Sequence, residues 1–149
     1  MRNYHLSQIN IALAHDSMES ETMSSFVERL DEINALADQS PGFIWRLQTD
    51  EGDATAIVAF EDPLIIVNMS VWKNMEVLQN YVYKSIHVDL LRNKRAWFSK
   101  MKNAHQVLWW VPEGHTPSVE EGKERLTLLN TNGPNKEAFT FAQSYSEPQ

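Results

Sequence analysis

The sequence predicts an α+β domain built as a ferredoxin-like antiparallel sheet with helices on one face. The expected strands and helices follow one another as β-α-β-β-α-α-β-α-β, and the first part of this order contains the split β-α-β-β-α-β unit. The expected strands alternate between apolar and polar residues, and the first expected helix carries one apolar stripe. Because helices on one face leave the other face of such a sheet open, we expect two copies to pair into a dimeric α/β barrel.

Strands are expected where apolar and polar residues alternate, and breaks where proline, glycine and acidic residues gather. The expected strands cover Tyr4–Leu13, Phe43–Gln48, Leu64–Trp72, Gln106–Val111 and Ala138–Gln143, and Ala54–Phe60 is a candidate for a further short strand. The apolar start of Leu64–Trp72 indicates a central strand.

Helices are expected over Ser20–Gln39, after the N-cap Asn74, over Ile86–Lys102, and in a last segment that ends at Gly133. This last helix starts either with Thr116 as N-cap and Pro117 in the first position, or with Ser118 as N-cap and Glu121 closing a capping box.

Length, composition and charge exclude several classes of protein. A length of 149 residues suits a single domain, which we assign to residues 1–143, with 144–149 as a loose C-terminal tail. The chain has no cysteine, which excludes disulfides and thiolate chemistry. A formal net charge of −7 argues against nucleic-acid binding. No apolar run is long enough to span a membrane and the first ten residues do not resemble a signal peptide, so we expect no membrane association and a cytoplasmic location.

Several expected strands carry polar side chains on one face. Gln8 and Asn10 share a face of the first strand, and Arg46 lies in the second. In the third strand Asn68, Ser70 and Trp72 share a face. A buried amide without a partner costs about 1–3 kcal/mol, so these groups need partners. They either satisfy one another, or backbone groups across a dimer interface, or they line a ligand pocket.

Aromatic residues and histidines complete the set of candidates. Adjacent residues Trp109 and Trp110 must point to opposite faces of their strand. Core filling explains most of the tryptophans, Trp45 among them, and leaves one or two for a cavity wall. Tyr83 is a further candidate for ligand binding. His87, at the start of a helix, is a candidate general base or axial haem ligand, and His115, in a loop rich in proline and glycine, is a second candidate base. No metal-ligand spacing is present, so no metal site is expected.

Long stretches of the chain resemble a bacterial family described as domain of unknown function 3291. These stretches are HLSQINIA from His5, INALADQSPGFIWRLQ ending at Gln48, NMSVWKNMEVLQNYVYKSIH from Asn68, RAWF from Arg95, LWWVPEGHTPSVEEGKERL from Leu108 and NGPNKEAFTF ending at Phe141. The family looks like the dimeric α/β-barrel superfamily, which includes antibiotic-biosynthesis monooxygenases without a cofactor and haem enzymes. The resemblance therefore implies a homodimer with a pocket, and it transfers no reaction.

Three functions stay open on this basis. The first is a small monooxygenase-like or isomerase-like enzyme without a cofactor, acting on a hydrophobic, aromatic small molecule. In this hypothesis Gln8, Arg46 and Asn68 hold an anion, and His87 or His115 takes the proton. The second is a haem-binding protein with His87 as ligand. The third is a non-catalytic binding or structural dimer.

Overall fold

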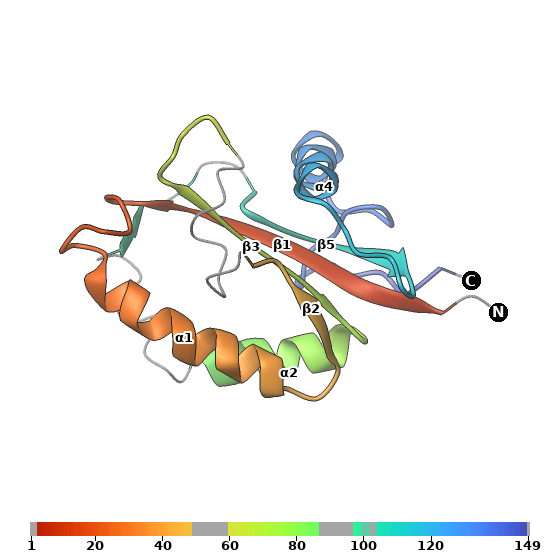
Figure 1. Ribbon diagram of the computed structural model, residues 1–149. Coiled ribbons are helices and arrows are strands. Elements are labelled where there is room, and N and C mark those ends of the chain that lie inside the picture. The colour runs from red at the N-terminus through yellow and green to blue at the C-terminus, as the bar shows by residue number, and fades with distance from the viewer. Residues whose placement is uncertain (1–2, 49–59, 87–96, 100, 102–103, 149) are drawn as a thin grey trace.

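The computed structural model describes residues 3–48, 60–86, 97–99, 101 and 104–148. Over these residues a five-stranded sheet is packed between helices (Figure 1). Its strands are β1 (Tyr4–Ala14), β2 (Phe43–Arg46), β3 (Ile65–Trp72), β4 (Phe98–Ser99) and β5 (Gln106–Pro112). The helices are α1 (Ser24–Gln39), α2 (Met75–Ile86) and α4 (Val119–Asn132). Among the described residues no helix is long and apolar enough to cross a membrane.

Strand β1 lies at the centre of the sheet, and every strand pairing is antiparallel. On one side β1 pairs with β3, which in turn pairs with the edge strand β2. On its other side β1 pairs with β5 along most of its length and with the short β4 at its far end. The predicted α+β fold with an antiparallel sheet is confirmed.

The helices form two layers, one on each side of the sheet (Figure 1). Helices α1 and α2 cover one face, as expected, and α4 lies over the other. On the α4 face, Leu126 and Leu129 of α4 pack into a buried cluster with Ile9 and Val107 of the sheet. Helix α4 therefore covers part of the face for which the sequence pattern suggested a second copy of the chain.

Helix ends follow the capping signals in the sequence. At α4 the hydroxyl of Ser118 accepts a 3.1 Å hydrogen bond from the backbone N–H of Glu121, which decides between the two expected starts in favour of Ser118. Helix α4 ends at Gly133, whose φ of 75° suits glycine. At α2 the side chain of Asn74 accepts a 3.0 Å hydrogen bond from the N–H of Val77, which confirms Asn74 as the N-cap.

The short strand β2 contains an irregularity that the sequence did not predict. Strict alternation places Phe43 and Trp45 on the same face, but the register with β3 shifts between these two residues. Phe43 consequently packs with Trp72 on the α1/α2 face, whereas Trp45 packs into the cluster on the α4 face. A single bulge is enough to exchange the two faces of a strand.

Two further segments differ from expectation. Phe98–Ser99, expected within a helix, forms β4, because its backbone pairs with Leu13 and Ala14 at the end of β1. Ala138–Gln143, expected as a strand, contributes two isolated bridges, from Phe139 to Leu108 of β5 and from Ala138 to Asn135. The segments expected as a short strand, 54–59, and as most of a helix, 87–96, lie outside the described residues.

Candidate functional site

Four polar side chains meet on the α1/α2 face of the sheet, where β1 and β3 run side by side. The register pairs Gln8 with Ser70 and Asn10 with Asn68. In an antiparallel pair, residues directly opposite each other point to the same side. Gln8 and Ser70 are buried, with 3% and 6% of their surface exposed, whereas Asn68 is exposed. The cluster therefore runs from the protein interior out to the surface.

Hydrogen bonds join these residues into what we call the Gln8 network: Gln8, Asn10, Asn68, Ser70 and Trp72. Nε2 of Gln8 donates to Oδ1 of Asn68 at 2.7 Å and to Oγ of Ser70 at 2.8 Å. Nε1 of Trp72 donates to the same Ser70 oxygen at 2.8 Å. Nδ2 of Asn10 donates to Oε1 of Gln8 at 3.2 Å. The amide of Gln8 thus fixes the orientation of its neighbours on both strands.

Two hydrogen-bond donors of the network are left over. The Ser70 oxygen already accepts from Gln8 and Trp72, so its own proton must point away from both. Asn68 uses its Oδ1 as an acceptor, and its Nδ2 group donates to no described residue. No described residue accepts the Ser70 proton either. The Ser70 hydroxyl and the Asn68 amide therefore each keep a donor that no described residue uses.

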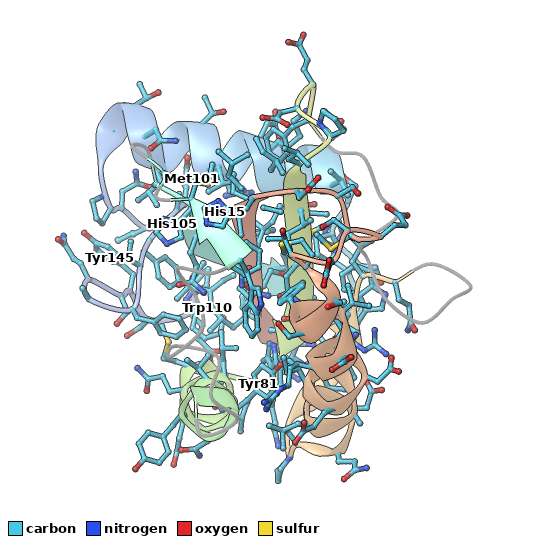
Figure 2. The ribbon with its side chains drawn as sticks, turned by 90° about the vertical axis from the view of Figure 1, so that its left-hand side faces the viewer. His15, Tyr81, Met101, His105, Trp110 and Tyr145 are labelled. Atoms are coloured by element: carbon cyan, nitrogen blue, oxygen red, sulfur yellow. The ribbon has the colours of Figure 1, made fainter. Side chains whose placement is uncertain are left out.

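Aromatic side chains continue this face from the network towards the helices. The fully buried Trp72 stacks on Tyr81 of α2, with ring centroids 4.8 Å apart, and meets Phe43 edge-on at 5.3 Å. Tyr81 lies between α1 and α2 (Figure 2), and its hydroxyl approaches the carbonyl oxygen of Ile33 in α1 at 3.5 Å. An apolar wall next to a few polar groups is the usual composition of a small-molecule site.

The phenol of Tyr81 stays protonated at neutral pH. Burial raises its pKa from 10.0 to about 12; the nearby guanidinium of Arg46 lowers the pKa and the carboxylate of Asp38 raises it. Tyr81 can therefore donate a proton in a hydrogen bond at neutral pH, and it is not a base there.

Arg46 was expected to hold an anion, and the structure gives its charge a partner within the chain. Nε of Arg46 donates to Oδ1 of Asp38 at 2.8 Å, and Nη2 donates to Oδ2 at 3.3 Å. Two parallel hydrogen bonds are the strongest arrangement between these groups. Any anion on this face must compete with Asp38 for the guanidinium.

Three predicted site residues lie on the opposite, α4 face. The buried indole of Trp109 donates to Oε2 of Glu121 at 2.8 Å, and Nε2 of His115 lies 2.7 Å from Oε1 of the same carboxylate. Trp45 packs against the cluster on this face as well. The sequence suggested one pocket containing these residues and the Gln8 network, but the sheet separates them. His115 therefore cannot act on a ligand held by the network.

The remaining predicted residues are Trp110, Tyr83 and His87. Trp110 lies on the α1/α2 face, but its indole donates to the backbone oxygen of Tyr145 at 2.8 Å (Figure 2). Tyr83 is 66% exposed on α2. His87, expected as base or haem ligand, lies outside the described residues.

Three residues of these sites are not among the site residues predicted from the sequence. Ser70 shares a face with Asn68, so the period of the strand was a sufficient signal for it. Glu121 was noticed for its capping role, and its two side-chain contacts depend on how α4 docks. Asp38 reaches Arg46 from α1, a contact that local sequence does not encode. Among the described residues, no group of three metal-ligating side chains is present.

Comparisons with known proteins give the family. The chain is similar to the solved structure of NE2512, a protein of unknown function from Nitrosomonas europaea, with a TM-score of 0.49 and 11% identity; the match covers 77% of this chain and 94% of that one. It is also similar to SnoaB, a cofactor-independent oxygenase from Streptomyces nogalater, with a TM-score of 0.46 and 13% identity; this match covers 75% of this chain and 95% of that one. A search of curated proteins found no match. A family model matches residues 5–149, and the chain therefore belongs to the family described as Domain of unknown function (DUF3291).

Proposed function

We propose that the chain binds a small aromatic molecule on the α1/α2 face and acts on it as a monooxygenase-like or isomerase-like enzyme without a cofactor. The observation that carries this proposal is the pair of donors left over in the Gln8 network, the hydroxyl of Ser70 and the Nδ2 group of Asn68. Fixed hydrogen-bond donors stabilise a ligand oxygen that gains negative charge when they donate to it. Trp72 is fully buried behind them, and the half-buried ring of Tyr81 that stacks on it is the aromatic surface left for the ring of the substrate.

No described residue on the α1/α2 face has been identified as a base that could remove the proton of the substrate. Tyr81 is protonated at neutral pH, and His115 lies on the other face of the sheet. We therefore propose a substrate that is itself acidic enough to ionise near neutral pH, such as a phenolic ketone with an activated methylene group. The protein then binds the anion more tightly than the neutral form, which increases the ionised fraction of the bound substrate.

The proposed reaction uses dioxygen as the oxidant. The substrate anion gives electrons to dioxygen, a carbon–oxygen bond forms at the activated methylene carbon, and the oxygen–oxygen bond breaks. One oxygen atom becomes the new carbonyl oxygen, and the other leaves as water with the two methylene hydrogens. In this reaction Ser70 and Asn68 donate hydrogen bonds to the substrate oxygen and stabilise its negative charge.

A phenolic anthrone is a suitable probe, because its methylene group is acidic and its oxidised product is coloured. The experiment follows oxygen uptake and the absorption of the anthraquinone product with wild type, Ser70→Ala and Asn68→Leu. Each variant is expected to lower kcat by about 10²- to 10³-fold, the range for loss of one oxyanion donor. Thr127→Ala, which removes a hydroxyl on the outside of α4, is the control and should turn over like wild type. Turnover that neither site variant changes would exclude the network from the reaction.

We also propose that the chain works as a cytoplasmic homodimer. Half-buried apolar residues on the α4 face, among them Trp45 and Phe60, and the 44% exposed Ile44 on the edge strand β2 support a partner surface. Light scattering on the purified chain tests this: twice the mass of the monomer supports the dimer, and the monomer mass contradicts it.

A further inference from the structure

A groove of about 720 Å³ lies at the end of the sheet where the two ends of the chain run side by side (Figure 1). We call it the terminal groove. Its walls come from the start of β1, the junction of β3 and α2, the end of β5 and residues 144–147. Its volume is in the range of sites that hold small molecules.

The terminal groove is separate from the Gln8 network. Tyr4, Leu6 and Gln8 follow one another along the same face of β1. Tyr4 lines the groove and Gln8 belongs to the network, while Leu6 between them is fully buried against Trp72 and Leu108. A layer of packed core thus divides the two places, so a ligand in one does not extend into the other.

One wall of the groove is aromatic and held in place. The indole of Trp110 donates a 2.8 Å hydrogen bond to the backbone oxygen of Tyr145, which fastens residues near the C-terminus to β5. The fully buried ring of Phe139 supports both residues, with centroids 6.5 Å from Trp110 and 6.0 Å from Tyr145. Trp110 and Tyr145 are themselves half-buried and line the groove.

The charges around the groove are mostly negative. Among the described residues that line it, Glu76, Glu113 and Glu147 are acidic, and Lys73 is the one lysine or arginine. Glu113 accepts a 3.0 Å hydrogen bond from the neutral side chain of Asn3 and forms no ion pair with a described residue. The carboxylate of Glu76 makes no hydrogen bond or ion pair with the described residues, and it offsets the positive N-terminal end of α2.

The geometry points to a second binding site in the terminal groove, for an organic cation with an aromatic or apolar body. The ammonium group of such a ligand lies among Glu76 and Glu113, and its body packs on Trp110 and Tyr145. Carboxylates attract the cation, and the faces of aromatic rings stabilise it further. This site is independent of the oxyanion site proposed above, whose ligand carries the opposite charge.

The test uses two probes with the same phenylethyl body and opposite charge, phenethylamine and hydrocinnamate. Two-dimensional ¹H–¹⁵N NMR follows the indole N–H of Trp110 and the backbone amides of Asn74 and Glu76 during each titration. Phenethylamine is expected to shift these signals, and hydrocinnamate is not. The double variant Glu76→Gln with Glu113→Gln should raise the Kd for phenethylamine by about tenfold or more.

The control is the double variant Glu120→Gln with Glu124→Gln, which removes the same charge from the exposed side of α4 and should leave the Kd within about twofold of wild type. The same spectra show whether each variant is folded. Three results would overturn the proposal: binding of hydrocinnamate in the groove as tight as that of the amine, no shift of the groove signals with phenethylamine, or an unchanged Kd in the groove variant.

Discussion

Gln8 of β1 donates a 2.8 Å hydrogen bond through Nε2 to Oγ of Ser70, the residue directly opposite on β3. The same Nε2 also donates to Asn68. One side chain therefore donates to both acceptors, and the donor groups of Ser70 and Asn68 have no acceptor among the described residues. The orientation of the proposed oxyanion site depends on this one glutamine.

Replacing Gln8 should cost stability. Gln8→Met keeps the volume of the side chain but removes its hydrogen bonds to Asn10, Asn68 and Ser70. We expect the free energy of unfolding to fall by about 1–3 kcal/mol, because buried groups lose partners. Urea unfolding measures this, with Gln48→Met as the control at an exposed position. A loss no larger than that of the control would mean that the network contributes nothing to stability.

The position of Gly122 should not tolerate a larger side chain. A Cβ at Gly122 would lie 2.7 Å from Cδ1 of Ile9, which is fully buried in the sheet. We expect Gly122→Ala to lower the free energy of unfolding by about 1–3 kcal/mol through overpacking, although alanine favours a helix. In an Ile9→Val background, which lacks Cδ1, the same change should be neutral or stabilising. Equal costs in the two backgrounds would contradict the packing of α4 on β1.

Tyr81 should make stability depend on pH in the alkaline range. Its pKa rises from 10.0 in the unfolded chain to about 12 in the folded one, so the folded state holds the proton more tightly. This contribution is complete below pH 10 and is lost as the pH rises towards 12, at about 1.4 kcal/mol per pH unit. Unfolding free energies of wild type and Tyr81→Phe between pH 9 and 11 measure it.

The comparison with Tyr81→Phe isolates this group from the other side chains that titrate in the same range. Wild type should lose stability more steeply than the variant above pH 10.0, the reference pKa of the phenol. Parallel curves would show that Tyr81 is not protected from ionisation, and hence that it is not buried between α1 and α2 in solution.

Replacing Glu121 on the α4 face should lower the free energy of unfolding. Glu121→Ala leaves the buried indole N–H of Trp109 without its acceptor, and we expect a loss of about 1–3 kcal/mol in unfolding free energy. Glu121→Gln keeps an acceptor for Trp109 and should lose less. Glu120→Ala, at an exposed position one residue earlier, should stay within about 0.5 kcal/mol of wild type. An equal effect of all three substitutions would show that the carboxylate does not hold Trp109.

The sequence predicted the long elements well, for physical reasons that can be named. The alternation along β1 and β3 and the apolar stripe of α1 reflect burial of one face, and the caps Asn74 and Ser118 act within one helical turn. The sequence did not show that α4 lies on the other face of the sheet. An apolar stripe predicts that one side of a helix is buried, but it does not predict which surface that side packs against. The bulge between Phe43 and Trp45 depends on pairing with β3, which is also not local.

The candidate site was only partly predictable. Gln8, Asn10 and Asn68 come together because each lies in phase on its strand, and period two is enough to show this. Trp109 is separated from this group because it pairs with Ser7 of β1, one residue out of phase with Gln8. His115 is separated because the loop before α4 brings it to Glu121. Arg46 looked available in the sequence, because its partner Asp38 comes from a different element.

The most direct test of the account is whether the α1/α2 face binds an aromatic oxyanion. The measurement is the absorption of para-nitrophenol as protein is added, at a pH where the free probe is mostly protonated. The account predicts that the bound probe ionises and turns yellow, that Ser70→Ala and Asn68→Leu abolish the change, and that Thr127→Ala keeps it. Binding of the neutral phenol alone, or the same yellow colour with all variants, would contradict it.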